Sequence, residues 1–249
     1  MQKSYVYDGT FEGYLTVLYD IFKSGDEPAC ICRANTGNAT LNLFFDEKHT
    51  AAEEKKYLLM KKAIIEKISS ETFENTVHAF LSEMPDIEMH IYRYVNTGRE
   101  KGSEVNKLLA DDNVIPVLRA AQRVTREGHR MLGFVRFADA GGIYYAKINP
   151  DCNVLPVIIP HFKARFGSQK WIIHDVVRNL AAFYDGKRCA IKPVESLELN
   201  GAADDEVKYA DMWKAYFQAM EIKSRHNSKL QRQLIPMKYR KNITEFDKQ

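Results

Sequence analysis

Hydrophobic periodicity changes near the middle of the chain, and this change limits the possible folds more than any other pattern in the sequence. After Pro116 the apolar residues recur at helical spacing, with Val117, Ala120 and Val124 on one side. Beyond Gly128 apolar and polar residues alternate instead, which is typical of strands. The sequence therefore predicts both a long helix and a sheet in the central part of the chain.

Short alternating segments follow this change and predict a small central sheet. Residues 132–137 and 143–148 flank the turn sequence DAGG at residues 139–142, which is typical of a hairpin. Three further strands are expected, at residues 171–175, 180–184 and 189–192. A helix over residues 156–166 can pack on this sheet, because a proline stands at its start and a glycine follows it. We expect the sheet to be antiparallel.

The N-terminal part combines short strands with helices. Residues 4–7 predict a strand and residues 11–22 an amphipathic helix. Residues 30–33 and 41–45 predict a strand pair. Further helices are expected at residues 51–67, 72–81, 87–95 and 105–110. The polar stretch NTGREKGS at residues 96–103 contains two glycines and is the best candidate for a linker.

The C-terminal part is predicted to be one long helix followed by a basic tail. Carboxylates favour the positive end of the helix dipole, and the acidic run at residues 204–206 is placed to begin such a helix. Five apolar residues then recur at helical spacing and are expected to face inward: Val207, Ala210, Trp213, Phe217 and Met220. Basic residues predominate in the tail at residues 225–241.

These patterns together predict an α+β protein of two parts. Residues 1–115 are expected to form an N-terminal α/β and helical part. Residues 116–249 are expected to form a small antiparallel sheet packed by helices, with the long C-terminal helix and its basic tail. A chain of 249 residues is long enough for one large domain or two small ones.

Charge is segregated along the chain, and this segregation predicts a surface that attracts anions. The net charge of +3 creates little field when it is spread over the whole surface. Between residues 119 and 136, however, there are five arginines and Glu127 is the one acidic residue. Arginine binds phosphate through two parallel hydrogen bonds, so we expect a nucleic-acid-binding face. Its predicted residues are Arg119, Arg123, Arg126, His129, Arg130, Arg136, Arg165, Lys238, Tyr239 and Arg240. The alternative is a solvated helix face with internal ion pairs.

Three polar residues form the best candidate for a catalytic site. His161 and Arg165 stand one helical turn apart, and a strand carrying His174 could lie beside them. Histidine can transfer protons near neutral pH and arginine can stabilise an oxyanion. His174 and Asp175 cannot both line one pocket in a regular strand, because adjacent residues point to opposite faces. The alternative is that these residues satisfy buried backbone groups.

Four aromatic residues could stack on unpaired bases, namely Tyr144, Tyr145, Phe162 and Trp171. The alternative is that they belong to the core, as aromatic residues on strands usually do.

The sequence predicts no metal and no cofactor. The intervals between His129, His161 and His174 match no metal-binding signature. The four cysteines include a CxC pair but no CxxC, and in a reducing compartment they are expected to be buried thiols. A phosphate-binding loop, a GxSxG motif and the zinc-deaminase pattern are all missing from the sequence. The first residues do not resemble a secretion signal and no run is apolar enough to cross a bilayer, so we expect no membrane association and a cytoplasmic location.

Several motifs, in order along the chain, resemble those of a bacterial family described as probable DNA metabolism or putative DNA repair proteins. They are YDGTFEG near the start, REGHRMLGFVRF, PHFKARF, WIIHDV with a later YDG, and MWKAYF followed by RQLIPMKYRKN. Members of that family are typically encoded beside a putative radical-SAM DNA modification or repair protein. A related domain also occurs fused to uracil-DNA-glycosylase-type domains.

The resemblance implies a DNA-associated protein of repair or modification that is the binding partner of a radical-SAM enzyme. It supplies no catalytic residue. Two alternatives stay open at this point. The chain could itself be an enzyme that acts on a nucleobase or a phosphodiester through His161, Arg165 and His174, or it could be a scaffold for the radical-SAM protein without contact to nucleic acid.

Overall fold

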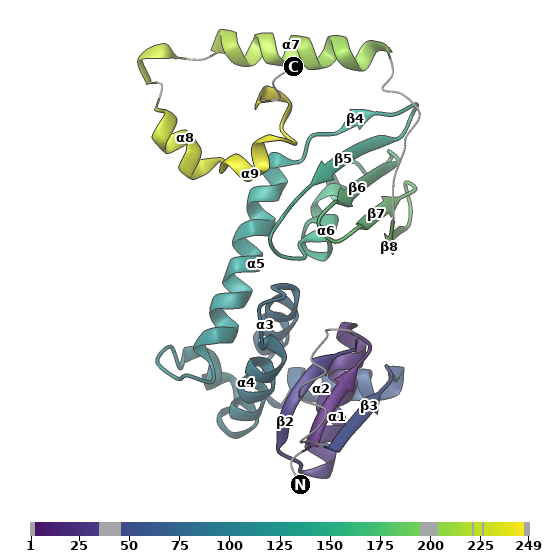
Figure 1. Cartoon of the computed structure of the whole chain (residues 1–249), viewed down its shortest axis with the longest axis vertical. Coiled ribbons are helices and arrows are strands. Elements are labelled where there is room, and N and C mark those ends of the chain that lie inside the picture. Colours follow the sequence, from purple (N-terminus) through teal and green to yellow (C-terminus); the bar gives the residue numbers. More distant parts are fainter. Residues whose placement is uncertain (1–2, 35–45, 195–203, 221, 226, 247–249) are drawn as a thin grey trace. The chain divides into compact units, whose positions relative to one another are not determined.

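The chain is a mixed α/β protein with two small sheets, seen here in a computed structural model (Figure 1). The structure describes residues 3–34, 46–194, 204–220, 222–225 and 227–246. Two compact units, Met1–Val124 and Thr125–Gln249, divide the chain. The division falls inside helix α5 (Ile115–Phe134).

The first unit contains a parallel sheet with strand order β2-β1-β3. Its strands are β1 (Lys3–Tyr7), β2 (Pro28–Arg33) and β3 (Asp46–Thr50). Helix α1 (Phe11–Ser24) joins β1 to β2, and such a crossover returns the chain in the same direction, so the two strands are parallel. The helix begins after Thr10, whose side chain accepts a hydrogen bond from the Gly13 amide, and ends at Gly25 in the left-handed region.

Three α-helices and one 3-10 helix complete the described part of the first unit before α5. They are α2 (Glu54–Lys67), α3 (Ser70–Leu81), α4 (Ile87–Lys101) and η1 (Gly102–Lys107). The predicted linker at residues 96–103 is wrong, because α4 and η1 occupy it. A Cβ atom on Gly98 would lie 2.9 Å from Ile68 Cδ1, so this glycine allows close packing of a helix. The predicted strand at residues 41–45 lies outside the described residues.

The cysteines only partly match the expectation from the sequence. Cys30 and Cys32, both in β2, are joined by a disulfide, so the expectation of thiols is wrong for this pair. Cys152 is a fully buried thiol, as expected.

The predicted strand at residues 132–137 is also wrong, because α5 continues to Phe134. Met131 is buried, and it continues the inward-facing row of Val124 and Glu127 at helical spacing. The apparent alternation after Gly128 is thus the end of an amphipathic helix. The short strand β4 (Ala138–Asp139) then pairs antiparallel with β5 (Tyr144–Ile148).

The sheet of the second unit is mixed, with strand order β4-β5-β6-β7-β8. Its remaining strands are β6 (Trp171–Asp175), β7 (Leu180–Tyr184) and β8 (Cys189–Pro193). The prediction of a purely antiparallel sheet is wrong, since β5 and β6 are parallel. Helix α6 (Leu155–Arg165) connects them as a crossover, while short turns make β6, β7 and β8 antiparallel.

Helix α6 confirms the helix predicted at residues 156–166, and it packs on one face of the sheet. Leu155, Ile158 and Phe162 are its buried residues. The Phe162 ring lies 6.4 Å from the ring of Trp171 in β6, centre to centre. This contact fixes α6 over the first residue of β6.

The C-terminal segment contains α7 (Asp204–Met220), η2 (Lys223–Arg225), α8 (Ser228–Leu234), α9 (Met237–Arg240) and η3 (Thr244–Phe246). The prediction that Trp213, Phe217 and Met220 face inward is wrong, because they are 42%, 39% and 63% exposed. Val207 and Ala210 belong to the same prediction, but their side chains lie outside the described residues. Phe217 contacts Phe246 of η3, with ring centres 6.1 Å apart.

No helix in the described ranges is both long enough and apolar enough to cross a membrane.

Candidate functional site

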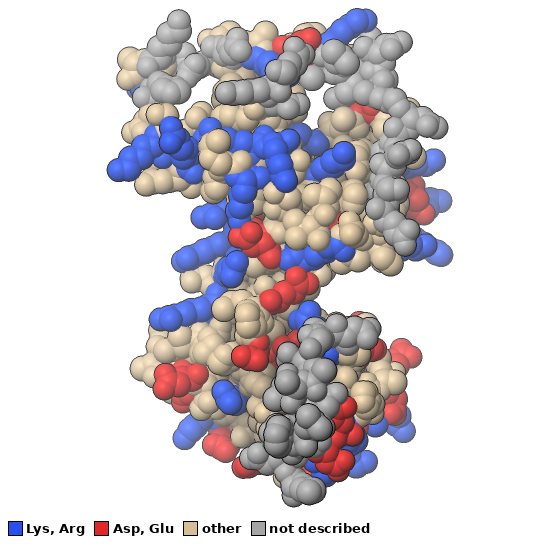
Figure 2. Space-filling view, in the orientation of Figure 1, with Lys and Arg blue, Asp and Glu red and all other residues tan. Residues whose placement is uncertain are grey.

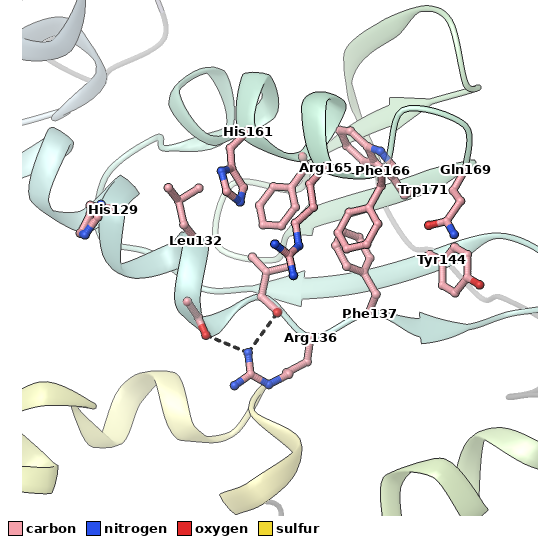
Figure 3. A pocket seen from close by; sticks show the side chains of 13 residues that line it. His129, Leu132, Arg136, Phe137, Tyr144, His161, Arg165, Phe166, Gln169 and Trp171 are labelled. Atoms are coloured by element: carbon pink, nitrogen blue, oxygen red, sulfur yellow. Dashed lines mark hydrogen bonds between the residues drawn. The ribbon is translucent and has the colours of Figure 1, made fainter. Parts of the chain in front are cut away.

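A pocket of about 850 Å³ lies in the second unit, between the end of α5, the start of β5 and β6, and α6 (Figure 3). Its aromatic lining residues are Phe137, Tyr144, Phe162, Phe166 and Trp171. Its polar lining residues are His129, Arg136, His161, Arg165 and Gln169. The pocket thus combines an aromatic wall with cationic and imidazole groups.

The aromatic wall is centred on Phe137. Its ring centre lies 5.5 Å from those of Phe162 and Phe166, and both contacts are edge-to-face. Phe162 and Trp171 are buried and belong to the core, whereas Phe137, Phe166 and Tyr144 are half-buried. The half-buried rings are fixed from behind and present part of their surface to the pocket.

His161 and Arg165 reach the pocket from the same side of α6, one helical turn apart. Figure 3 shows both projecting from α6 toward Leu132 and Phe137. Both side chains are exposed, and among the described residues no carboxylate forms an ion pair with either. The Arg165 guanidinium lies 5.8 Å from the ring centre of Phe166. These two residues can therefore accept an anion without first breaking an internal ion pair.

Helix α5 supplies further exposed cations to the second unit. Arg126, His129 and Arg130 are exposed, and His129 lines the pocket. No described carboxylate pairs with Arg126 or Arg130, which stand one helical turn apart. In Figure 2, Lys and Arg side chains gather on the face shown, where α8, α9 and the C-terminal end of α5 lie. Two more predicted residues, Arg119 and Arg123, are exposed in α5 but belong to the first unit.

Arg136 lines the pocket but is held by a carboxylate. Its Nη2 lies 2.7 Å from Glu245 Oε1 and its Nε 3.2 Å from Glu245 Oε2. Its Nη1 also donates to the Gly133 carbonyl at 2.7 Å. Burial tends to raise the pKa of Glu245, but the hydrogen bonds and charge of Arg136, together with further hydrogen bonds to the carboxylate, outweigh burial and the pKa is lowered. Arg136 thus fastens η3 to the end of α5.

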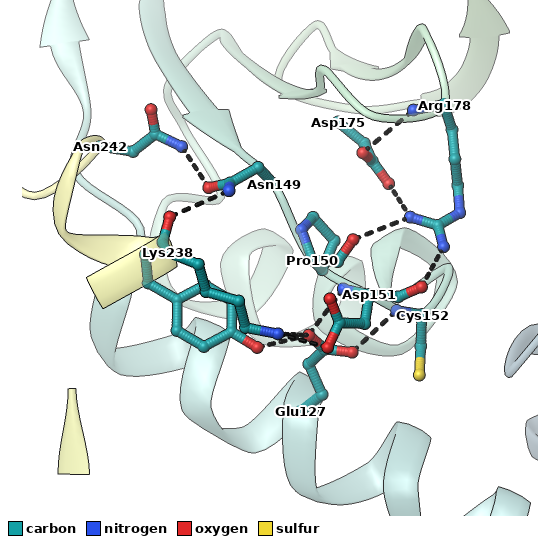
Figure 4. Close-up of polar contacts among 10 residues, drawn as sticks. Glu127, Asn149, Pro150, Asp151, Cys152, Asp175, Arg178, Lys238 and Asn242 are labelled. Atoms are coloured by element: carbon teal, nitrogen blue, oxygen red, sulfur yellow. Dashed lines mark hydrogen bonds and ion pairs between the residues drawn. The ribbon is translucent and has the colours of Figure 1, made fainter. Parts of the chain in front are cut away.

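Glu127 organises a second group of residues, the Glu127 cluster, which consists of Glu127, Asp151, Cys152, Lys238 and Tyr239 (Figure 4). Two of them, Lys238 and Tyr239, belong to the predicted nucleic-acid-binding face. Glu127 is 5% exposed and accepts hydrogen bonds from the Asp151 and Cys152 amides, both at 2.8 Å. Tyr239 Oη donates to Glu127 Oε1 at 2.5 Å, and Lys238 Nζ binds Asp151 and lies 3.9 Å from Glu127 Oε1. The cluster connects α5, the segment after β5, and α9.

The protonation equilibria of the Glu127 cluster reflect these contacts. Burial alone would raise the pKa of Glu127. The hydrogen bonds from Tyr239, Asp151 and Cys152 together outweigh the effect of burial, so the pKa is lowered. Burial, together with the hydrogen bond to Glu127, raises the pKa of Tyr239 to about 12. Arg240, next in the chain, donates from Nε to the Ile235 carbonyl at 3.0 Å and lies over the Phe246 ring. The predicted cations of the C-terminal tail therefore hold the tail in place.

His174 does not join His161 and Arg165. It lies on the face of the sheet opposite Trp171, where its Nδ1 is 2.8 Å from Tyr145 Oη. Burial lowers the pKa of His174, and the charge of Lys147 lowers it further. Asp175 is fully buried and binds the Val177 amide and Arg178, so it orders the turn after β6. The structure brings two of the three predicted catalytic residues to one pocket.

Metal ligation has no support in the described part of the chain. No group of three or more His, Cys, Asp or Glu residues is arranged there to hold an ion. His129 and His161 line the pocket, but His174 lies on the other face of the sheet.

Several pocket residues are missing from the predicted set, namely Leu132, Phe137, Phe166 and Gln169. Phe166 could have been predicted, because it stands four residues after Phe162 and so falls on the same helix face. Glu127 also had a signal, because it is the one acid of its arginine-rich stretch and falls on the apolar side of the helix. Of the predicted stacking residues, Tyr144 lines the pocket and Tyr145 faces away from it.

Comparison with known proteins gives one match. A family model described as a domain of unknown function, DUF4130, matches residues 85–245, which include nearly all of the second unit and the pocket. No curated protein and no solved structure matches the chain. Since the family model covers more than half of the sequence, the chain belongs to the DUF4130 family.

Proposed function

We propose that this chain is a DNA-associated protein of repair or modification, which contacts the phosphate backbone through the exposed cations of its second unit. One observation carries the proposal. Arg126, Arg130 and Arg165 are exposed and have no described carboxylate partner, whereas Arg136 and Lys238 in the same unit are bound to carboxylates. Cations that stabilise no internal charge are available for an external polyanion.

The chemistry of these groups favours phosphate over other anions. A guanidinium presents several N–H donors in a plane and can hold two phosphate oxygens at once. Each neutralised phosphate releases counterions, so binding weakens as salt is added. These contacts carry no base sequence information, which suits a protein that acts at many positions in DNA.

The partner in this proposal is a radical-SAM enzyme that performs the chemistry on DNA. Its support is the resemblance of the sequence motifs to a family encoded beside such an enzyme. In this arrangement the present chain binds DNA and the partner supplies the reaction. A cytoplasmic location stays a prediction of the sequence.

A titration of labelled DNA tests the proposal. Anisotropy is measured with the full chain and with the Arg126→Gln/Arg130→Gln double variant over a range of salt concentrations. We expect the slope of log affinity against log salt to become shallower by about 2 in the double variant, one unit for each lost phosphate contact. Lys147→Gln is the matched control, because Lys147 is exposed on the face of the sheet opposite the pocket. Absence of binding at low salt would refute direct DNA contact.

A second candidate function is catalysis by this chain on a nucleobase or a phosphodiester. The observation that favours it is the shared position of His161 and Arg165 in one pocket. His161 would transfer a proton and Arg165 would stabilise negative charge on oxygen. Activity of the purified pair with the radical-SAM protein is compared between the wild type and the His161→Ala and Arg165→Ala variants. Unchanged activity in both variants would exclude this role. Co-purification of the pair without any DNA affinity would instead indicate a scaffold.

A further inference from the structure

We infer that the pocket receives one unstacked nucleobase of a DNA strand, with His161 and Arg165 contacting the phosphate beside it. The protein would then prefer unpaired nucleotides to fully paired DNA. This inference rests on the proposed function and names its substrate class. Four features of the pocket support it: its size, its aromatic wall, its polar groups and its charge.

The size of the pocket suits one nucleotide. Small-molecule sites are typically concavities of about 300–1,000 Å³, and the present pocket measures about 850 Å³. A base pair inside a duplex is stacked on both faces and cannot offer a ring to a pocket. A base reaches such a site when it is unpaired or turned out of the helix.

The aromatic wall is suited to stacking. Phe137, Phe166 and Tyr144 are half-buried, so part of each ring is open to a ligand. Phe162 and Trp171 are buried behind them and hold the wall in place, with ring centres 5.5 Å and 6.4 Å from Phe137. A wall that is already fixed loses little conformational entropy when a ring binds. Stacking of this kind tolerates any base, because every base has a π face.

Polar groups are available for the edge of the base. Figure 3 shows Gln169 and Tyr144 next to each other, apart from His161. An amide and a phenol can each donate and accept, which fits the mixed donors and acceptors of a base edge. In addition, the buried indole N–H of Trp171 finds no hydrogen-bond acceptor among the described residues. A base carbonyl or ring nitrogen could supply one after a small movement of the wall.

The charged residues that line the pocket favour an anionic ligand. Arg136, Arg165, His129 and His161 line the pocket, and no described Asp or Glu does. A cationic ligand would be repelled, and an uncharged apolar one would leave the guanidinium of Arg165 unused. A molecule with both an aromatic ring and an anionic group can stack on the aromatic wall and pair with Arg165. A nucleotide is such a molecule.

Fluorescence of Trp171 can report the occupied pocket. The chain has 2 tryptophans, so Trp213→Phe leaves Trp171 as the single indole. This variant is titrated with a single-stranded oligonucleotide, with the paired duplex, with a duplex containing one unpaired base, and with a mononucleotide. We expect a change of Trp171 emission with the single strand and the unpaired base, and affinity about tenfold higher than for the paired duplex.

Two substitutions and a control assign the effect to the pocket. Phe166→Leu should weaken single-strand binding by about tenfold and leave paired-duplex binding almost unchanged. Arg165→Gln should weaken binding to both, because it removes a phosphate contact, and the loss should be larger for the single strand. Lys163→Gln, on the same helix and exposed outside the pocket lining, should change binding less than about twofold. A 2-aminopurine at the unpaired position reports stacking on the wild-type chain, so the test does not depend on the folding of the Phe166 variant.

The outcomes separate the two proposals. Equal binding of paired and unpaired DNA, with no response of 2-aminopurine, would overturn the base pocket and leave the proposed function standing. Absence of binding to any DNA would overturn the proposed function itself. A mononucleotide that binds as tightly as the oligonucleotide would assign the pocket to free nucleotides and overturn the inference for a strand.

Discussion

The pocket and the Glu127 cluster are both built on the end of α5, and they use cationic residues in opposite ways. In the Glu127 cluster, Lys238 lies against two carboxylates, and the buried Glu127 accepts hydrogen bonds from three donors in two segments of the chain. In the pocket, Arg165 is exposed and pairs with no described carboxylate. The difference shows that the position of a buried acid decides which cations stabilise the fold and which are available to a ligand.

Arg136 lines the pocket but is held by a carboxylate, as Lys238 is in the Glu127 cluster, so it is an intermediate case. It lines the pocket, yet two of its nitrogens bind Glu245. Its guanidinium thus lines the pocket, but its charge is compensated by Glu245 and its hydrogen bonds hold η3. The comparison predicts large stability effects in the Glu127 cluster, intermediate effects at Arg136, and almost none at Arg165.

The largest expected effect is that of Glu127→Ala. The change leaves the Asp151 and Cys152 amides and Tyr239 Oη without their acceptor, so it should lower the free energy of unfolding by about 3–5 kcal/mol. Urea denaturation followed by circular dichroism measures it. Glu127→Gln keeps one acceptor oxygen and should cost less. Equal and small losses for both variants would contradict the stabilising role of the Glu127 cluster.

Arg136→Gln should have the next largest effect. It removes a bidentate, charge-assisted contact to Glu245, and hydrogen bonds to charged groups contribute about 1.5–3 kcal/mol. Hydrogen exchange of η3 should accelerate, since this contact holds it to α5. A double-mutant cycle with Glu245→Gln isolates the pair, and a coupling energy near zero would show that the contact does not hold η3.

Acid should weaken the second unit through Glu127. The folded state lowers the pKa of this carboxyl below its unfolded value of about 4.3, so the ionised form is favoured by folding. Its contribution is fully present above that unfolded value and is lost as the pH falls through the lower folded value. The free energy of unfolding, measured between pH 6 and the acid range, should fall less steeply in Glu127→Gln. Glu245 shifts in the same direction, so part of the slope should remain in that variant.

The sequence predicted much of the local structure but not the connections that build the site. Helix α6 and strands β6, β7 and β8 lie where the apolar pattern placed them, because that pattern is local. The direction of β5 relative to β6 depends on the crossover of α6, and alternation alone does not encode it. The apolar pattern of residues 132–134 fits both a helix and a strand. In the structure these residues are helical, because α5 continues past the buried Met131.

The candidate site was predictable in composition and only partly in geometry. His161 and Arg165 are four residues apart in one helix, so the sequence alone predicted that their side chains lie on the same face. The role of Lys238 did not, because its acid partners are 87 and 111 positions away in the chain, at Asp151 and Glu127. A basic residue in a sequence gives no sign of whether folding will bring a carboxylate to it.

The smallest stability effect, and the sharpest contrast with Glu127, should come from Arg165→Gln. The side chain is exposed and forms no described ion pair, so its loss should change the free energy of unfolding by less than about 0.5 kcal/mol. The same urea denaturation used for Glu127 measures it, with Lys163→Gln on the same helix as the control. A loss above about 1.5 kcal/mol, comparable to that of Arg136→Gln, would mean that Arg165 also stabilises the fold. Arg165 would then not be available to a ligand, and the pocket would use its cations to stabilise the fold as the Glu127 cluster does.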